Sequence, residues 1–188
     1  MKRIETELPG VCIIEPEVFQ DSRGHFFESY HREKFAALGI ETVFVQENQS
    51  LTRKGIIRGL HYQLNHPQAK LCRVIAGEVF DVTVDIRVGS ETFGRWFGVT
   101  LSAANRRQIY IPHGFAHGFI VRSEFAEFIY KCDDFYHPED ECGVLWSDPQ
   151  LAIAWGNANP QLASRDAAYL PLSQISPDRL PRYKRTDD

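Results

Sequence analysis

The fold class is decided by the stretch Val79-Phe80-Asp81-Val82-Thr83-Val84-Asp85-Ile86-Arg87, in which apolar and polar side chains alternate from Phe80 onward. Period two is typical of a β-strand with one buried face and one polar face. Gly77-Glu78 comes just before it and indicates a turn, which follows an apolar strand expected at residues 71–75. This part of the chain therefore predicts a β-rich fold.

Strand patterns also dominate the rest of the chain. Further strands are expected at residues 11–14, 26–30, 96–101, 107–111, 118–121 and 126–131, with Gly, Pro, Ser and Asn in the gaps. Helix is scarce, and the two short candidates are residues 31–38, ended by Gly39, and residues 164–168. Many short strands in one domain, residues 1–188, predict an all-β antiparallel sandwich or barrel. The Pro-, Arg- and Asp-rich tail, residues 177–188, is expected to pack loosely.

Composition narrows the class of function. The 188 residues are 43% hydrophobic and 24% charged, which suits a soluble globular domain. A net charge of −4 gives no basic field for nucleic acid or a membrane, so an anionic substrate needs a local cluster of Arg, Lys and His. No apolar run approaches the roughly 20 residues of a membrane span, and the N-terminal residues lack the apolar core of a signal peptide. We expect a cytoplasmic protein.

Four cysteines, Cys12, Cys72, Cys132 and Cys142, are scattered without a Cys-x-x-Cys pair. Such spacing is typical of reduced thiols in a cytosolic protein. The alternative is a disulfide between Cys132 and Cys142, which flank an acidic loop, in an oxidising compartment.

The most distinctive stretch is Pro112-His113-Gly114-Phe115-Ala116-His117-Gly118. Its pattern Pro-x-Gly-x-x-His resembles the second conserved motif of cupins, small jelly-roll barrels that often bind a metal. The alternative is a turn followed by a core histidine. A cupin metal site also needs two His separated by one residue, but the region around His61 has one such His, followed by Lys70. Because a protonated Lys repels a divalent cation, the sequence predicts a barrel without a metal.

Five short motifs occur in order along the chain. They are Asp21-Ser22-Arg23-Gly24-His25-Phe26-Phe27-Glu28, Gln46-Glu47-Asn48-Gln49-Ser50, Arg58-Gly59-Leu60-His61-Tyr62-Gln63, Gly114-Phe115-Ala116-His117-Gly118-Phe119 and Tyr130-Lys131-Cys132. Together they resemble the dTDP-4-dehydrorhamnose 3,5-epimerase family over residues 3–172. The resemblance implies a cupin-like jelly roll, no cofactor, and a dTDP-4-keto-6-deoxy-sugar as substrate.

The chemistry of such a reaction explains the residue types. Protons on carbons 3 and 5 lie next to the 4-keto group, so their removal gives an enolate, and inversion requires a base on one face and an acid on the other. The resemblance implies that His61 is the base, Asp166 orients it, Lys70 stabilises the enolate and Tyr130 is the acid. Taken singly, Tyr130 is more typical of a core residue and Asp166 of a helix cap.

The resemblance also implies a set of substrate-binding residues and a homodimer. The segment with Arg23 and Glu28 is expected to reach the neighbouring subunit's site, while Phe19, Phe26 and Tyr136 are candidates to stack on the base. Family members commonly have Lys where Arg165 stands, which makes this contact the least secure. The residues expected to hold the nucleotide diphosphate are Arg23, Glu28, Gln46, Glu47, Asn48, Arg58, His117, Glu141 and Arg165.

Other functions are compatible with parts of the pattern. An epimerase that inverts only carbon 3 or only carbon 5 would use the same base and acid. A metal-dependent cupin dioxygenase would need the missing His pair. A non-catalytic sugar-nucleotide-binding barrel would not need His61, Asp166, Lys70 and Tyr130 together.

Overall fold

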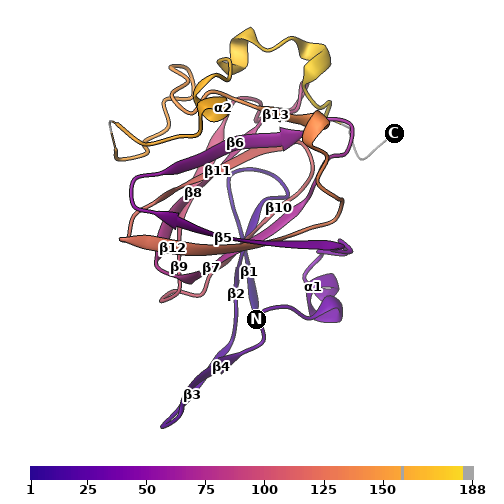
Figure 1. The fold of residues 1–188 in the computed structure, drawn as a ribbon. Helices are drawn as coiled ribbons and strands as arrows, with labels where there is room; N and C mark the ends of the chain where they lie inside the picture. Colours follow the sequence, from indigo (N-terminus) through magenta and orange to yellow (C-terminus); the bar gives the residue numbers. More distant parts are fainter. Residues whose placement is uncertain (158, 184–188) are drawn as a thin grey trace.

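The computed structural model describes residues 1–157 and 159–183, which form two facing antiparallel β-sheets (Figure 1). One sheet has six strands, in the order β1 (Lys2–Glu5), β2 (Cys12–Glu15), β10 (Gln108–Ile111), β7 (Lys70–Ala76), β12 (Phe125–Cys132) and β5 (Gln46–Arg53). The other has five, in the order β13 (Glu141–Gly143), β6 (Ile57–Gln63), β11 (Phe115–Val121), β8 (Glu78–Asp85) and β9 (Trp96–Ser102). The fold is the cupin-like jelly roll that the resemblance implied.

The elements outside these sheets are short. A two-stranded hairpin, β3 (Val18–Asp21) and β4 (Gly24–Phe27), projects from one end of the molecule (Figure 1). The helices are α1 (Arg32–Ala37) and α2 (Ser164–Ala167), with 3₁₀ turns η1 (Pro138–Asp140), η2 (Leu172–Gln174) and η3 (Pro177–Arg179). No helix in the described part of the chain is long and apolar enough to cross a membrane.

Strand β8 confirms the alternation, but both of its faces are buried. Val82 and Val84 pack outward against the C-terminal third of the chain, including Trp155. On the inward face Asp81 and Thr83 are completely buried, although they are polar. Inward polar groups are costly in an apolar interior unless they have partners, so this face is the first sign of a site between the sheets.

Two strands near the site were not among the strands predicted from the sequence patterns. Strand β5 is polar along most of its length, yet it pairs with β12 through eight residues, from Gln46↔Cys132 to Arg53↔Phe125. It is an edge strand, so its polar side chains meet either solvent or the cavity instead of a core. Strand β6 is interrupted by Gly59, whose φ of 116° places its backbone against Gly118, and a Cβ there would lie 2.5 Å from the Gly118 Cα.

The prediction of a loosely packed C-terminal tail is partly wrong. Residues 177–183 are anchored: Leu180 is buried, and the Tyr183 N–H donates to the carbonyl oxygen of Val88 at 3.0 Å. The Arg87 guanidinium lies over the rings of both Phe115 and Tyr183, at 4.2 and 5.0 Å from their centroids. Residues 184–188 of the expected tail lie outside the described residues.

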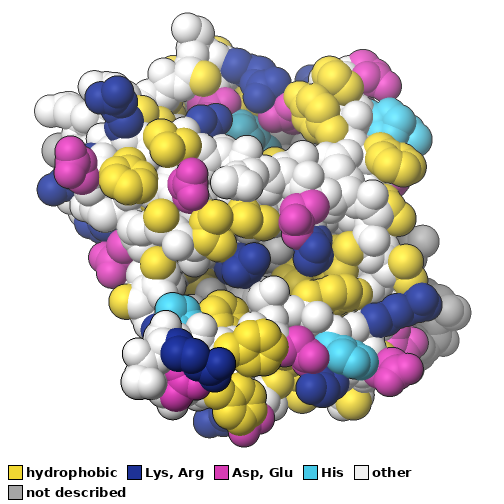
Figure 2. Space-filling view, turned by 60° about the horizontal axis from the view of Figure 1, so that its bottom comes forward, with side chains coloured by type: hydrophobic (Ala, Val, Ile, Leu, Met, Phe, Trp, Pro, Cys, Tyr) yellow, Lys and Arg dark blue, Asp and Glu magenta, His cyan; other side chains and the backbone are white. Residues whose placement is uncertain are grey.

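Charge is mixed over the face of the molecule seen from the hairpin end. Figure 2 shows Lys and Arg side chains interspersed with Asp and Glu, and hydrophobic side chains scattered among them. Among the described residues seen on this face, Lys and Arg do not form the continuous basic patch that is typical of nucleic-acid binding.

Candidate active site

A cavity of about 840 Å³ opens between the two sheets. The five-stranded sheet contributes Arg58 and His61 from β6 and His117 from β11, while the six-stranded sheet contributes Lys70 from β7 and Tyr130 from β12. A smaller cavity of about 70 Å³ shares His61, Lys70 and Tyr130 and continues toward Phe115. The remaining predicted residues that line the large cavity are Gln46, Asn48, Tyr136, Glu141, Arg165 and Asp166.

His61 and Asp166 form a dyad on one wall. His61 Nε2 lies 2.9 Å from Asp166 Oδ1, and the Gly59 N–H donates to the other carboxylate oxygen at 3.2 Å. Burial favours the neutral acid, but the hydrogen bond and charge of His61, the Gly59 N–H and Arg165 outweigh it, so the pKa of Asp166 is lowered. The carboxylate accepts from Nε2–H, which leaves Nδ1 as the lone-pair nitrogen of the neutral ring.

Tyr130 and Lys70 lie on the opposite wall. The Lys70 ammonium is 5.8 Å from the centroid of the Tyr130 ring. Burial raises the pKa of Tyr130 to about 12, with smaller contributions from Cys132, Cys72 and Glu141 that Arg58 partly offsets. The hydroxyl therefore keeps its proton at any neutral or mildly alkaline pH.

Glu141 lies beside the dyad. Its side chain is 8% exposed, and it accepts hydrogen bonds from Arg165 and from the hydroxyl of Tyr136. Its Oε1 is 3.7 Å from His61 Nδ1. The hydrogen bond to Glu141 raises the pKa of Tyr136.

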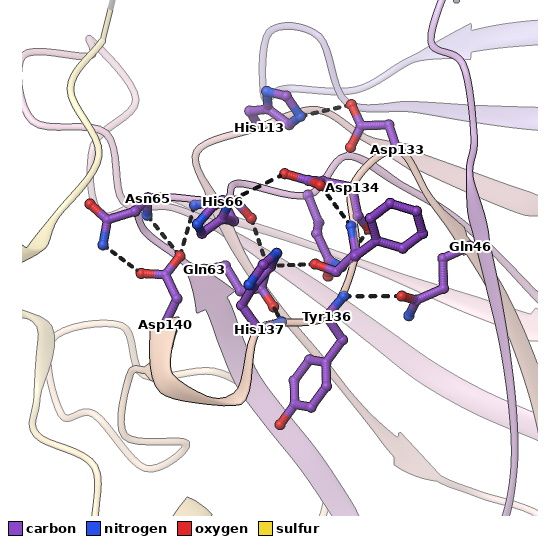
Figure 3. Close-up of polar contacts among 12 residues, drawn as sticks. Gln46, Gln63, Asn65, His66, His113, Asp133, Asp134, Tyr136, His137 and Asp140 are labelled. Atoms are coloured by element: carbon purple, nitrogen blue, oxygen red, sulfur yellow. Dashed lines mark hydrogen bonds and ion pairs between the residues drawn. The ribbon is translucent and has the colours of Figure 1, made fainter.

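The loop that carries Tyr136 is held by a polar network (Figure 3). The Tyr136 N–H donates to Gln46 Oε1 at 3.0 Å, which ties this loop to β5. The rings of His66 and His137 stack at 3.8 Å between centroids and link it to the loop between β6 and β7. Asp140 accepts from the N–H groups of Asn65 and His66, each at 2.8 Å. Tyr136 is therefore fixed from two sides.

His117 forms a second, deeper pair. Its Nε2 lies 2.8 Å from Asp81 Oδ2, and Asp81 is completely buried. His117 is directly opposite His61 in the β11–β6 register. His117 therefore lies on strand β11 and lines the large cavity.

Comparison with known proteins shows the family of the chain. The family model described as dTDP-4-dehydrorhamnose 3,5-epimerase matches residues 5–174. The chain belongs to this family. The enzyme of that name from Shigella flexneri is 54% identical over 88% of this chain and 93% of its own. A Legionella pneumophila dTDP-6-deoxy-D-glucose-3,5-epimerase, crystallised with dTDP-4-keto-L-rhamnose, superposes with a TM-score of 0.95 at 51% identity, covering 98% of this chain and 99% of that one. A 3′-monoepimerase from Streptomyces bikiniensis in complex with dTDP-quinovose gives a TM-score of 0.89 at 34% identity over 95% and 92% of the two chains.

Within this epimerase-family chain, five predicted binding residues do not reach the cavity. Arg23 is 88% exposed on the hairpin, paired with Asp21 at 2.5 Å. Phe19 and Phe26 are exposed on the same hairpin, and Glu28 follows it and pairs with Lys34 at 2.9 Å. Glu47 points to the opposite face of β5 from its neighbours, because strand side chains alternate, and it pairs with Lys131.

Some residues of the epimerase site were not among the predicted ones. Asp81 was noticed only as a polar residue of an alternating strand, and that alternation was the available signal. Tyr169 packs edge-on against His61, with ring centroids 5.9 Å apart, and Gln68 lines both cavities. Neither belongs to a motif or a repeating pattern, so no signal in the sequence singled them out.

The described residues contain no group of three or more His, Cys, Asp or Glu side chains arranged to hold a metal ion. The absence of a metal remains a prediction. All four cysteines, which lie within the described ranges, are free thiols.

Proposed function

We propose that this chain converts dTDP-4-dehydro-6-deoxy-D-glucose to dTDP-4-dehydro-L-rhamnose by inverting carbons 3 and 5. The observation that carries the proposal is that His61 of β6, paired with Asp166 of α2, lines one side of a cavity that Tyr130 and Lys70 of the other sheet also line. A base and an acid on opposite walls are what inversion through a planar enolate requires.

The first step is proton removal by His61. Asp166 holds the ring through Nε2–H, so Nδ1 faces the substrate and takes the proton from carbon 3 or carbon 5. The imidazolium that forms is stabilised by the Asp166 carboxylate, as in other His–Asp pairs. The electron pair of the broken C–H bond moves to the 4-keto oxygen.

The enolate is stabilised by Lys70. Its ammonium lies on the opposite wall, close to Tyr130 and with access to the cavity. A fixed cation beside the oxygen where charge develops lowers the barrier, and sites of this kind commonly contribute about 100- to 1,000-fold.

The second step is protonation by Tyr130 on the opposite face. Because burial raises the pKa of Tyr130 to about 12, its proton is present when the enolate carbon becomes basic. The C–H bond forms on the new face, and the tyrosinate and the imidazolium then exchange protons with water to restore the enzyme. The same pair acts at both carbons, one after the other.

The nucleotide diphosphate is held at the open side of the cavity. Arg58 lines it from β6, with its Nε donating to Thr52 Oγ1 at 2.8 Å, and Gln46 and Asn48 line it from β5. Tyr136 is the stacking candidate that lies in the cavity. Arg58 supplies local positive charge in a chain of net charge −4, which suits phosphate recognition.

The working enzyme is a homodimer in the cytoplasm, in which Arg23 and Glu28 complete the partner's site. Support comes from the hairpin, which projects away from the body of its own chain (Figure 1) and exposes Arg23, Phe19 and Phe26. The four free thiols suit a reducing compartment.

Complementation tests the shared site. An equal mixture of Arg23→Ala and His61→Ala proteins, allowed to exchange subunits, should regain up to about a quarter of wild-type activity, because about half of the dimers are hybrids and each hybrid contains one intact site. Each variant alone should be inactive or nearly so. Demonstrated subunit exchange without recovery of activity would contradict the shared site.

Inversion of a single carbon is the second candidate. The structural likeness to a 3′-monoepimerase favours it, because the same fold houses that reaction. Incubating the protein with the 4-keto sugar nucleotide in deuterated water, with NMR to locate the label, separates the candidates. Deuterium at both carbons supports the proposal, deuterium at one carbon supports the second candidate, and no label at either carbon overturns both.

A further inference from the structure

The Arg165 guanidinium forms two parallel contacts with the Glu141 carboxylate. Arg165 Nη2 lies 2.7 Å from Glu141 Oε1, and Nη1 donates to Oε2 at 2.9 Å. A guanidinium that meets a carboxylate with two parallel bonds fixes its position as well as its charge. The Tyr136 hydroxyl also donates to Oε2. The carboxylate is thus held by Arg165 and Tyr136 together.

The Oε1 atom of Glu141, which contacts Arg165, also faces His61. Glu141 Oε1 is 3.7 Å from His61 Nδ1, which is the nitrogen left free by the bond to Asp166. That separation exceeds a hydrogen bond, whereas the contact to Arg165 is 1.0 Å shorter. Arg165 therefore occupies an oxygen that a small rotation of the carboxylate would bring to Nδ1.

A contact between Glu141 and Nδ1 would disable the base. With Asp166 on one nitrogen and Glu141 on the other, both ring nitrogens would donate to carboxylates, and only the imidazolium has two N–H groups. Two negative neighbours would hold that charged form. An imidazolium has no lone pair with which to take a proton from substrate.

We infer that Arg165 is a positioning residue that withholds Glu141 from His61 and so keeps the imidazole free to accept a proton. The inference rests on the proposed role of His61 as the base. It assigns Arg165 an action through Glu141, which is distinct from direct contact with the nucleotide diphosphate.

The charge around His61 comes from all the elements that pack against it. Its register partner on β11, His117, is paired with Asp81 instead. The groups that face the ring or line the same cavity include Asp166 and Arg165 of α2, Tyr169 after α2, Glu141 of β13, Arg58 of β6, Lys70 of β7 and Tyr130 of β12. Of these, Arg165 is the cation in contact with both flanking carboxylates, at 2.7 Å from Glu141 and 3.9 Å from Asp166.

A double-mutant cycle separates the two roles of Arg165. The proteins are R165A, E141Q and R165A/E141Q, with R165K as the conservative variant and R107A as a matched control. Arg107 forms a similar ion pair with Glu15, at 2.8 Å, on another part of the surface. The readouts are kcat and KM for solvent proton exchange, measured from pH 5.5 to 9.5.

We expect R165A to lower kcat at neutral pH by at least about tenfold and to move the acid limb of the profile up by about one unit or more. In the E141Q background the same substitution should lower kcat by less than about threefold, because a neutral amide cannot hold the imidazolium. R165K should fall between R165A and wild type, and R107A should match wild type. A rise in KM with kcat unchanged, or equal losses in both backgrounds, would overturn the inference and leave Arg165 as a substrate ligand.

NMR of the free protein tests the inference without any turnover. With histidines labelled at Cε1 and the His61 signal assigned from its absence in His61→Gln, the R165A protein should keep the His61 proton to a higher pH than wild type. R165A/E141Q should return toward wild type. Identical titration in R165A and wild type would overturn the inference while leaving the proposed function intact. Failure of wild type to exchange substrate protons would overturn the proposed function. The titration would still show whether Arg165 keeps Glu141 away from His61.

Discussion

The two walls of the cavity hold their functional groups in opposite ways. On the wall of β6, the His61 side chain is 24% exposed and lies between two carboxylates, Asp166 and Glu141. On the wall of β12, Tyr130 lies among buried apolar residues and cysteines, with Lys70 as the nearby cation. The difference shows how the surroundings of each group suit its proposed role in proton transfer. A base needs charged partners that orient it, whereas an acid needs burial that keeps its proton in place.

The largest effect should come from removing the base. His61→Ala should lower solvent exchange at both carbons by about 100- to 10,000-fold, because the neighbouring carboxylates Asp166 and Glu141 are held by hydrogen bonds in the described structure. Binding of the nucleotide should change little. NMR of the sugar protons in deuterated water measures the first quantity, and calorimetric titration with dTDP measures the second. Exchange at the wild-type rate would show that the base lies elsewhere.

A smaller effect should follow from removing the partner of the base. Asp166→Asn leaves His61 in place but removes the charge that orients it, so exchange should slow by about 10- to 100-fold, less than in His61→Ala. Steady-state exchange rates of the two variants, measured side by side, check this order. A drop as large as that of His61→Ala would show that Asp166 takes part in proton transfer itself.

The same variant should also change the response to acid. The folded-state pKa of Asp166 is lowered, so its carboxylate stabilises the fold above the unfolded-state pKa, and that contribution is lost as pH falls through the acid range. Asp166→Asn should therefore flatten the dependence of the free energy of unfolding on pH below about 4. Urea unfolding at several pH values measures it. An unchanged slope would contradict the lowered pKa.

The fold followed from the sequence where one face of a strand is apolar. Strands near residues 71–75, 96–101 and 126–131 lie where they were predicted, because hydrophobic periodicity reports burial directly. Strand β5 was missed, since its side chains serve the cavity and an exposed edge, and polar strands look like loops. The anchored tail was missed because its contacts, such as Tyr183 with Arg87, are distant in sequence.

The site, like the fold, could be predicted from the sequence only in part. The motifs and the family resemblance together pointed to residues that share the cavity, including His61, Tyr130, Lys70 and Asp166. They did not give the partners that tune those residues. Neither the 3.7 Å separation of Glu141 from His61 nor the buried partner of His117 is a property of spacing along the chain. Tertiary packing alone creates these contacts, so they required the structure.

Metal removal is expected to have no effect on turnover. Lys70 supplies a cation to the cavity, and both walls supply their charge from side chains. EDTA should leave turnover unchanged, and elemental analysis of active protein should find no stoichiometric metal. Loss of turnover with EDTA, restored by zinc or iron, would contradict a metal-free mechanism.

The comparison of the two walls is tested most directly by Tyr130→Phe. The variant keeps the ring and removes the hydroxyl, so His61 should still take the proton and return it, or a solvent deuteron, to the original face. The measurement is the ratio of deuterium incorporation to net epimer formation, followed by NMR on one sample in deuterated water. We predict label with retained configuration and inversion slower than exchange by about 100-fold or more. Inversion that keeps pace with exchange would contradict the assignment of Tyr130 as the acid.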